Sequence, residues 1–454
     1  MSEVHVVGGG LAGAEAAFQL AVRGHDVILH EMRGVRSTEA HRTDLLAELV
    51  CSNTFKSTEL TNAHGLLKAE MRMLGSVLLD AADAARIPAG TALAVDRELF
   101  SRGVHDRVTA HPRVRVVREE VTRLPSPAIV ATGPLTSDAL AEAIRLRLGI
   151  ASLAFYDAIA PIVDAESIDR AVVFAASRYD KETMPGERDA YLNCPMSRED
   201  YEAFIAALGA ADQFTAKAFD QVPYFEGCMP VEEMARRGPE TLRFGPMKPV
   251  GLTDPRTGRR PYAVVQLRAE DRAGRMRNLV GFQTRMRYPE QQRVFRTIPG
   301  LERAEFLRFG QIHRNSYLNS PVALTPHLSL RDDRMVLFAG QVTGVEGYTE
   351  SMATGLVAAI NLDRMLRGDD PVVPPPTTML GALYRYLREA DPAHFQPMNA
   401  NFGLLDELAD PPRDKARKKA LYAERALRDL RDWAEASGVS PLAGAPTATG
   451  HSSV

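Results

Sequence analysis

Val6-Val7-Gly8-Gly9-Gly10-Leu11-Ala12-Gly13 is the stretch of sequence that decides the fold. Gly8, Gly10 and Gly13 satisfy the spacing G-x-G-x-x-G, which is a weak signal by itself. The context strengthens it, because a run rich in β-branched residues precedes the glycines and a predicted helix over 12–20 follows them. The glycines allow a tight turn, a close approach of backbone to pyrophosphate, and close packing of helix on strand. The stretch therefore predicts a dinucleotide-binding strand–turn–helix unit.

A second predicted strand, 26–30, follows this helix and ends at Glu31. The Glu31 carboxylate lies about 18 residues beyond Gly13, close to the roughly 20 expected of the acid that accepts the ribose hydroxyl. The N–H groups and partial positive charge of the helix N-terminus suit a pyrophosphate. NAD and FAD are both bound by this fingerprint, so it does not choose between them. The candidate cofactor-binding residues here are Gly8, Gly9, Gly10, Leu11, Ala12, Gly13 and Glu31.

Two further segments favour FAD. The apolar strand 128–133 closes in Ala-Thr-Gly and resembles the second strand motif of two-dinucleotide flavoproteins. Residues 335–347 resemble their C-terminal motif, in which a strand is followed by glycines and then by a helix whose N-terminus favours negative charge on a reduced flavin. These segments add the candidate cofactor-binding residues Ala131, Thr132, Gly133, Gly340, Gln341, Gly344 and Gly347.

The composition of the 454-residue chain, 45% hydrophobic and 25% charged, is that of a globular α/β protein. We predict a Rossmann-like FAD-binding domain of the two-dinucleotide flavoprotein type with an inserted α+β domain. The middle of the chain is richer in arginine, tyrosine, methionine and proline than the two ends. The predicted boundaries are 1–155 and 326–370 for the FAD-binding domain, 156–325 for the inserted substrate domain, 371–436 for a helical C-terminal segment, and 437–454 for a disordered tail.

Several classes of protein are excluded by simpler observations. No run approaches the roughly 18 consecutive apolar residues of a membrane span, and the first residues do not resemble a secretory signal. Three cysteines form neither a disulfide framework nor a metal-binding pattern. We therefore expect a cytoplasmic enzyme without a metal. The net charge of -3 gives no general attraction for a polyanion, so binding to nucleic acid would need a local basic patch.

Two of the cysteines are candidate reactive thiols. Cys51 stands in Cys-Ser-Asn-Thr-Phe-Lys-Ser and Cys228 in Phe-Glu-Gly-Cys-Met-Pro, and both contexts suit accessible side chains. An ordinary thiol is only a few per cent ionised at pH 7, so a nucleophile needs a nearby cation or helix N-terminus. The cations near in sequence are Lys56 and His41 for Cys51, and Arg236 and Lys248 for Cys228. A structural role is the alternative for each, and it is our interpretation of Cys194.

The segments around Cys51 and Cys228, with 242–252, 280–284 and 338–351, are similar to those of the folate- and FAD-dependent tRNA uracil-5-methyltransferases. The resemblance extends from the first glycines to about residue 365. It implies that 5,10-methylenetetrahydrofolate donates a one-carbon unit, which reduced FAD carries to C5 of the T-loop uridine of tRNA (position 54), giving 5-methyluridine. It further implies NAD(P)H as the reductant, and neither a membrane nor an obligate protein partner.

This chemistry explains a need for two thiols. Uracil C5 becomes nucleophilic when a thiolate adds to C6, and the C5 proton must afterwards be removed by a base. Carried over by motif, Cys228 is the candidate nucleophile and Cys51 the candidate base, and the two roles are exchangeable at this stage. Tyr348, Asn53 and Lys56 are candidate substrate-binding residues.

A basic stretch gives independent support for RNA binding. Between Arg268 and Arg296, eight arginines against three acidic residues make a local balance of +5. Arg285 and Arg287 are the candidate phosphate contacts, because arginine binds phosphate in a bidentate manner. Stacking on an extruded base is expected of Tyr288, Phe282 or Phe295. A second basic cluster comprises Lys415, Arg417, Lys418 and Lys419, and a solvated charged face is the alternative for both.

Two alternative functions stay open. One is the related FAD- and folate-dependent modification of the tRNA wobble uridine, whose enzyme is normally longer and has a large C-terminal helical domain. The other is a flavoprotein oxidoreductase that does not act on RNA, or a flavin-bound module that only binds RNA. The sequence does not indicate NADH or NADPH, the oligomeric state, or the residues that hold folate.

Overall fold

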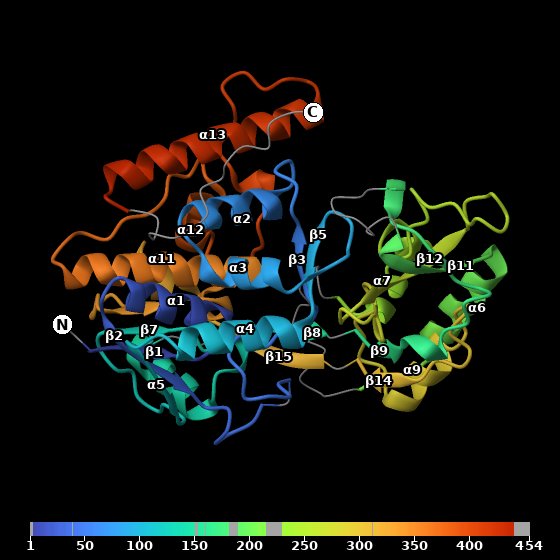
Figure 1. Ribbon diagram of the computed structural model, residues 1–454, viewed down its shortest axis with the longest axis horizontal. Coiled ribbons are helices and arrows are strands. Elements are labelled where there is room, and N and C mark those ends of the chain that lie inside the picture. The colour runs from blue at the N-terminus through green and yellow to red at the C-terminus, as the bar shows by residue number, and fades with distance from the viewer. Residues whose placement is uncertain are drawn as a thin grey trace.

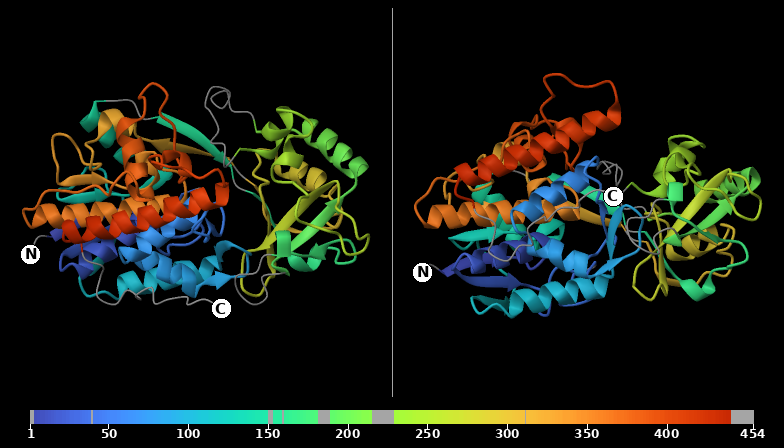
Figure 2. Two further views of the ribbon diagram at one scale, coloured as in Figure 1. Left: turned by 90° about the horizontal axis from the view of Figure 1, so that it is seen from above. Right: turned by 45° about the horizontal axis from the view of Figure 1, so that its top comes forward.

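The chain forms two lobes (Figure 1). One is built from both ends of the chain and the other from its middle, which confirms the predicted fold class, a Rossmann-like α/β domain with an inserted α+β domain. Figure 2 shows the two lobes from two further directions. This computed structural model describes residues 3–38, 40–149, 153–158, 160–180, 189–214, 229–310 and 312–439.

The first lobe has a five-stranded parallel sheet of order β16-β7-β1-β2-β6. The strands β16, β7, β1 and β2 are mostly buried, as is usual for parallel strands that are covered on both faces, whereas the edge strand β6 is only partly buried. The ligand crevice of such a sheet lies at the carboxyl ends of its strands. The bounds are β1 (Glu3–Val7), β2 (Asp26–Glu31), β6 (Val114–Arg118), β7 (Ala128–Val130) and β16 (Val336–Phe338).

Two helices, α1 (Leu11–Val22) and α11 (Tyr348–Leu366), pack closely together on one face of this sheet (Figure 1). A Cβ atom at Gly355 would lie 2.2 Å from the Ala12 carbonyl oxygen, so only glycine permits this approach. The other helices of the lobe are α2 (Ala63–Met73), α3 (Val77–Ala84), α4 (Arg97–Thr109), α5 (Asp138–Leu148) and the short α10 (Ser320–Ala323).

The C-terminal helices α12 (Met379–Glu389) and α13 (Lys415–Ala436) pack against α2. The Glu70 carboxylate of α2 accepts the N–H groups of Met379 and Leu380 at 2.7 and 2.8 Å, at the start of α12. A buried carboxylate therefore satisfies backbone donors that the first turn of a helix leaves unpaired.

The second lobe contains a six-stranded antiparallel sheet of order β10-β11-β12-β13-β9-β14. Its core includes Cys194, Phe204, Phe282 and Phe295, all of which are fully buried. The strands are β9 (Ile162–Asp164), β10 (Phe174–Ala175), β11 (Tyr191–Met196), β12 (Ala263–Ala269), β13 (Met276–Leu279) and β14 (Phe306–Arg308). The helices are α6 (Arg198–Gly209), α7 (Val231–Arg236), α8 (Thr241–Phe244) and α9 (Tyr288–Phe295).

The chain passes between the lobes along an antiparallel pair of strands, β8 (Leu153–Ala158) and β15 (Ile312–Tyr317). A small antiparallel sheet, β3 (Thr54–Ser57), β5 (Ala92–Val95) and β4 (Arg86–Ile87), lies on the side of the first lobe that faces the second (Figure 1). No helix in the described ranges has both the length and the apolar character that crossing a bilayer would require. Two sequence-based predictions fall outside the described residues: Cys228, and the tail 437–454 from residue 440 onward.

Polar contacts join the two lobes around one buried side chain. Asn53 donates its amide to the carbonyl oxygens of Val95 and Ala269, both at 2.9 Å, and its Oδ1 accepts from Arg268 Nε at 2.8 Å. Arg97, at the start of α4, forms an ion pair with Glu270 of the inserted lobe. The lobes are thus held in place by specific side chains as well as by the two linking strands.

Candidate active site

An outer cavity lies at the carboxyl ends of four neighbouring strands, β16, β7, β1 and β2. It collects segments that are more than 300 residues apart in sequence, because parallel strands deliver their carboxyl ends to the same edge of the sheet. Of the predicted cofactor-binding residues, those lining it are Gly8, Gly9, Gly10, Leu11, Ala12, Glu31, Ala131, Thr132, Gly133, Gly340 and Gln341.

The three fingerprint glycines differ in what surrounds them. Gly8 has φ +100°, and a Cβ atom there would lie 2.7 Å from the Ala131 carbonyl oxygen. A Cβ atom at Gly13 would lie 1.8 Å from the Gly8 carbonyl oxygen, so this glycine permits α1 to pack on the turn. At Gly10, an added Cβ atom would have no protein atom within 4 Å. The space beside Gly10 is therefore open to a ligand, whereas protein atoms fill the space beside Gly8 and Gly13.

Glu31 is bound to the glycine turn. Its Oε2 accepts from the Gly9 N–H at 2.8 Å and from Arg33 Nη2 at 2.8 Å. Burial alone would raise the pKa of Glu31, but the hydrogen bond and charge of Arg33 hold that pKa below its usual value. The carboxylate is therefore ionised at neutral pH at the edge of the cavity. Arg33 was not predicted from the sequence, because it belongs to no motif.

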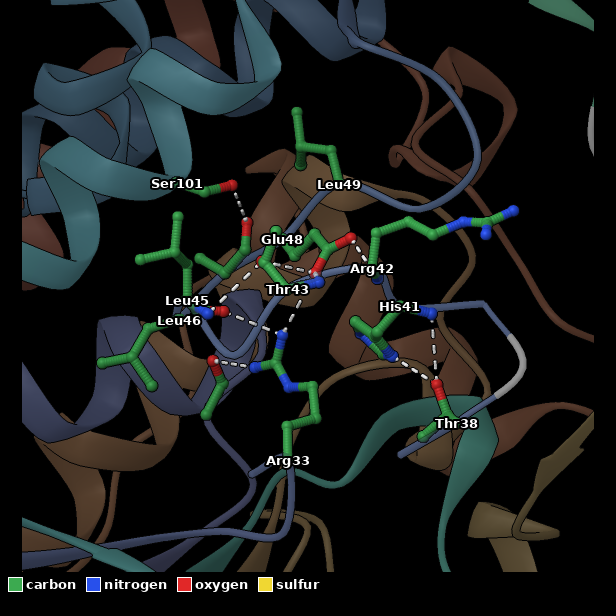
Figure 3. A network of polar contacts seen from close by, with 12 residues as sticks. Arg33, Thr38, His41, Arg42, Thr43, Leu45, Leu46, Glu48, Leu49 and Ser101 are labelled. Carbon is green, nitrogen blue, oxygen red and sulfur yellow. Dashed lines mark hydrogen bonds and ion pairs between the residues drawn. The ribbon is translucent and has the colours of Figure 1, made fainter. Parts of the chain in front are cut away.

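The loop after β2 is ordered by its own polar contacts (Figure 3). Arg33 Nη1 donates to the Leu45 carbonyl oxygen at 2.8 Å, and Glu48 accepts from the Thr43 hydroxyl at 2.7 Å. The Ala47 N–H donates to the Gly9 carbonyl oxygen at 2.9 Å, which fastens the loop to the glycine turn. His41 bonds to Thr38 and lines this outer cavity. A second, inner cavity is lined by Cys51, and His41 does not line it.

An inner cavity adjoins the outer one, and its walls come from both lobes. The two cavities share lining residues, among them Gln341 and Tyr348. Cys51, Lys56 and Glu350 line the inner cavity from the first lobe, and Arg268, Asn278 and Gln283 line it from the inserted lobe. The predicted cofactor residue Gly347 also lies here. A ligand in the outer cavity can therefore meet one held beside a cysteine.

The backbone at Cys51 is held by two polar side chains. The Tyr348 hydroxyl accepts from the N–H groups of Cys51 at 2.8 Å and Ser52 at 3.0 Å. Burial, and secondly negative charge at Cys51, raise the pKa of Tyr348, so this hydroxyl stays protonated. Arg97 Nη2 donates to the Cys51 carbonyl oxygen at 3.2 Å. Arg97 is a cation near Cys51 that the sequence did not reveal, since it lies 46 residues away at the start of α4.

Two residues of opposite charge, Lys56 and Glu350, line the same cavity. Lys56 has φ +63°, a left-handed conformation that is uncommon for a residue other than glycine and often marks functional sites. Glu350, in the first turn of α11, accepts from His64 Nδ1 at 3.1 Å and from the Ala400 N–H at 2.9 Å. Burial would raise the pKa of Glu350, but the bond from His64 and the charge of Lys56 lower it to about 2.

Several predicted site residues lie away from both cavities. Asn53 is fully buried between the lobes, with its amide group used by the contacts described above. Gly344 packs against Phe395, since a Cβ atom there would lie 2.5 Å from Phe395 Cζ. In the inserted lobe, Arg285 forms an ion pair with Glu233, and Arg287 forms one with Asp212 at 3.0 Å.

The basic stretch does not form one exposed face. Arg268 and Arg285 are buried, at 5% and 7% exposure. The expectation that Phe282 or Phe295 stacks on a base is wrong, because both rings are fully buried in the core of the inserted lobe. Tyr288 is the accessible ring of the three, at 38% exposure. In the part of the chain that is described, no group of three or more His, Cys, Asp or Glu side chains is arranged to hold a metal ion.

Comparison with known proteins identifies the family. The family model described as "Glucose inhibited division protein A" matches residues 3–370. The chain is 57% identical over 432 residues to the methylenetetrahydrofolate--tRNA-(uracil-5-)-methyltransferase TrmFO of Geobacter sulfurreducens, covering 95% of this chain and 98% of the relative. The chain belongs to the TrmFO family. A TrmFO from Anoxybacillus flavithermus is 55% identical over 432 residues, with 95% and 99% covered.

A solved structure has the same fold as this TrmFO family member. GidA of Aquifex aeolicus superposes with a TM-score of 0.69 at 16% identity, and the match covers 96% of this chain and 74% of GidA. At this identity the likeness concerns the fold alone. The TrmFO family and GidA therefore share the arrangement of a dinucleotide-type lobe with an inserted lobe.

Proposed function

We propose that this chain is a folate- and FAD-dependent tRNA uracil-5-methyltransferase. It would transfer a one-carbon unit from 5,10-methylenetetrahydrofolate to C5 of the T-loop uridine of tRNA, with NAD(P)H as reductant. One observation carries the proposal: the cavity at the dinucleotide-binding fingerprint adjoins a second cavity, which is lined by a cysteine. The names of its TrmFO relatives support the same reaction.

The outer cavity fits FAD by the chemistry of its walls. The open space at Gly10 and the N-terminus of α1 suit a pyrophosphate, and the ionised Glu31 at the end of β2 suits a ribose hydroxyl. Gly340 and Gln341 lie next to the shared wall and would contact the part of the cofactor nearest the inner cavity. Bound FAD would supply electrons and carry the one-carbon unit.

The protein's own groups would activate and position the uracil. Cys51 would remove the C5 proton, while Cys228, outside the described residues, would add to C6. These roles are exchangeable. Tyr348 and Arg97 hold the backbone of Cys51 and so fix where its thiol can reach. Lys56, which lines the same cavity, would attract an anionic substrate group.

One assay tests the proposal. The NAD(P)H-reduced holoenzyme is incubated with methylene-labelled 5,10-methylenetetrahydrofolate and an unmodified tRNA transcript, and the label is mapped by nuclease digestion. We expect label in 5-methyluridine at position 54, and none in a matched transcript with cytidine at that position. Label at the wobble base would identify the related modification enzyme instead. Oxidation of NAD(P)H without labelled RNA would indicate an oxidoreductase.

Replacement of Cys228 tests its proposed role in the same assay. The Cys228→Ala variant should retain stoichiometric flavin and lose methyl transfer, because no thiolate would then add to C6. Turnover at the wild-type rate would remove Cys228 as the nucleophile.

A further inference from the structure

Two neighbouring polar side chains belong to the wall that the inserted lobe presents to the inner cavity. Arg268 on β12 and Asn278 on β13 are directly opposite each other in the antiparallel register. Directly opposed residues point to the same face of a sheet. Both residues line the inner cavity, as do Cys51 and Lys56 of the first lobe.

Asn278 is a buried amide without a partner. Its exposure is 3%, and its carboxamide forms no hydrogen bond to any other residue in the described ranges. Buried polar groups in proteins are nearly always hydrogen-bonded, and leaving one unpaired is unfavourable. Because Asn278 lines a cavity, a bound molecule is the partner that would satisfy both its N–H and its C=O groups.

Arg268 is held in one position beside it. Its Nε donates to Asn53 Oδ1 at 2.8 Å, and its Nη2 lies 4.0 Å from Glu270 Oε1. Asn53 is itself fixed by two backbone carbonyl groups, one from each lobe. Arg268 is 5% exposed, so its charge cannot swing into solvent and remains at the cavity wall.

We propose that Asn278 and Arg268 together bind the lactam edge of a planar ring, in which a ring N–H stands next to a C=O group. This inference rests on the proposed function and deepens it. An amide can accept from the ring N–H and donate to the carbonyl oxygen, while a guanidinium only donates. Uracil and the pterin of folate both present N3–H beside C4=O, so either ring supplies this chemistry.

The pair would also favour a lactam over an amino-substituted ring. An amide alone can rotate to exchange its donor and acceptor, and would then fit the N3 and amino group of cytosine equally well. Arg268 can only donate hydrogen bonds, so an amino group facing it would bring two donors together without an acceptor, which is unfavourable. Arg268 therefore determines specificity, whereas Asn278 contributes affinity.

The test compares two asparagines of the same sheet in the FAD-loaded protein. In Asn278→Ala, the KM for tRNA or the KM for methylenetetrahydrofolate should rise about tenfold, because the lactam loses its partner. The Tm should not fall, because the group removed is unpaired in the protein. The control is Asn193→Ala on β11, whose amide donates to Phe174 and Ala176 and accepts from Gln266. This control should lower the Tm and leave both KM values unchanged.

The two KM values distinguish the sources of the ring. A rise confined to tRNA identifies uracil, and a rise confined to the folate identifies the pterin. A titration of flavin absorbance with tetrahydrofolate, and separately with a T-arm stem–loop RNA, gives a readout that needs no turnover. If the wild type binds a probe about tenfold more tightly than Asn278→Ala but transfers no methyl group, the proposed function fails and this inference stands. Equal binding of both probes by both proteins, or no binding by the wild type, would overturn it.

Discussion

Gly10 and Gly13 belong to the same glycine fingerprint, yet an added methyl group would have different consequences at the two positions. Gly10→Ala meets no protein atom within 4 Å, so the protein should fold normally but lose flavin, because the methyl group occupies the space left for pyrophosphate. Gly13→Ala places a carbon 1.8 Å from the Gly8 carbonyl oxygen and should lower the Tm itself. Absorbance at the flavin band and thermal melts measure both. A yellow Gly10→Ala protein of normal stoichiometry would contradict the first expectation.

Cys51 and Cys194 should differ sharply in reactivity. Cys51 is partly exposed and lines the inner cavity, whereas Cys194 is fully buried on β11 and burial raises its pKa. Iodoacetamide reacts with thiolates, so alkylation of the native protein should be at least about tenfold faster at Cys51. Peptide mapping by mass spectrometry separates the two sites. Equal rates in the folded protein would show that Cys51 is not accessible.

At the scale of elements, Glu70 should make the docking of α12 on α2 dependent on pH. Burial raises the pKa of Glu70 to about 8, although the N–H groups of Met379 and Leu380 lower it in part. The folded protein therefore binds a proton that the unfolded chain, with a pKa near 4.5, releases. This contribution to stability is complete below about pH 4.5 and is lost as pH rises to about 8, at no more than about 1.4 kcal/mol per pH unit.

Glu70→Gln should remove that dependence. The amide keeps one acceptor for the start of α12 but does not titrate between pH 4.5 and 8. Urea denaturation at several pH values should give a flatter profile for the variant than for the wild type over this range. Parallel profiles would mean that Glu70 does not change protonation on unfolding.

The elements that could be predicted from the sequence are those whose signal is local. Strand, glycine turn and helix follow one another over residues 4–22, so Gly8, Gly10 and Glu31 could be assigned from spacing alone. Arg97 and Asn278 could not, because Arg97 reaches the Cys51 backbone, and Asn278 the inner cavity, only when distant elements meet. Gly344 was predicted from its pattern to bind the cofactor. In the structure, the absence of a side chain at Gly344 instead makes room for the ring of Phe395.

At the scale of the whole molecule, Asn53 should control how the lobes are held together. Asn53→Ala removes three hydrogen bonds and leaves Arg268 and two buried carbonyl groups without their partner. We expect a loss of about 2 to 4 kcal/mol in the free energy of unfolding, with flavin stoichiometry unchanged. Chemical denaturation and the flavin-to-protein ratio measure the two effects. An unchanged denaturation midpoint would show that the lobes do not depend on this residue.

The inserted lobe leaves the first lobe along β8 and returns along β15, so its two points of attachment lie side by side. Replacing the segment between these two points with that of a relative would alter the wall that the inserted lobe gives to the inner cavity. The lobe that binds FAD would stay intact. Natural selection can therefore change substrate choice and redox chemistry separately, although both depend on the same inner cavity.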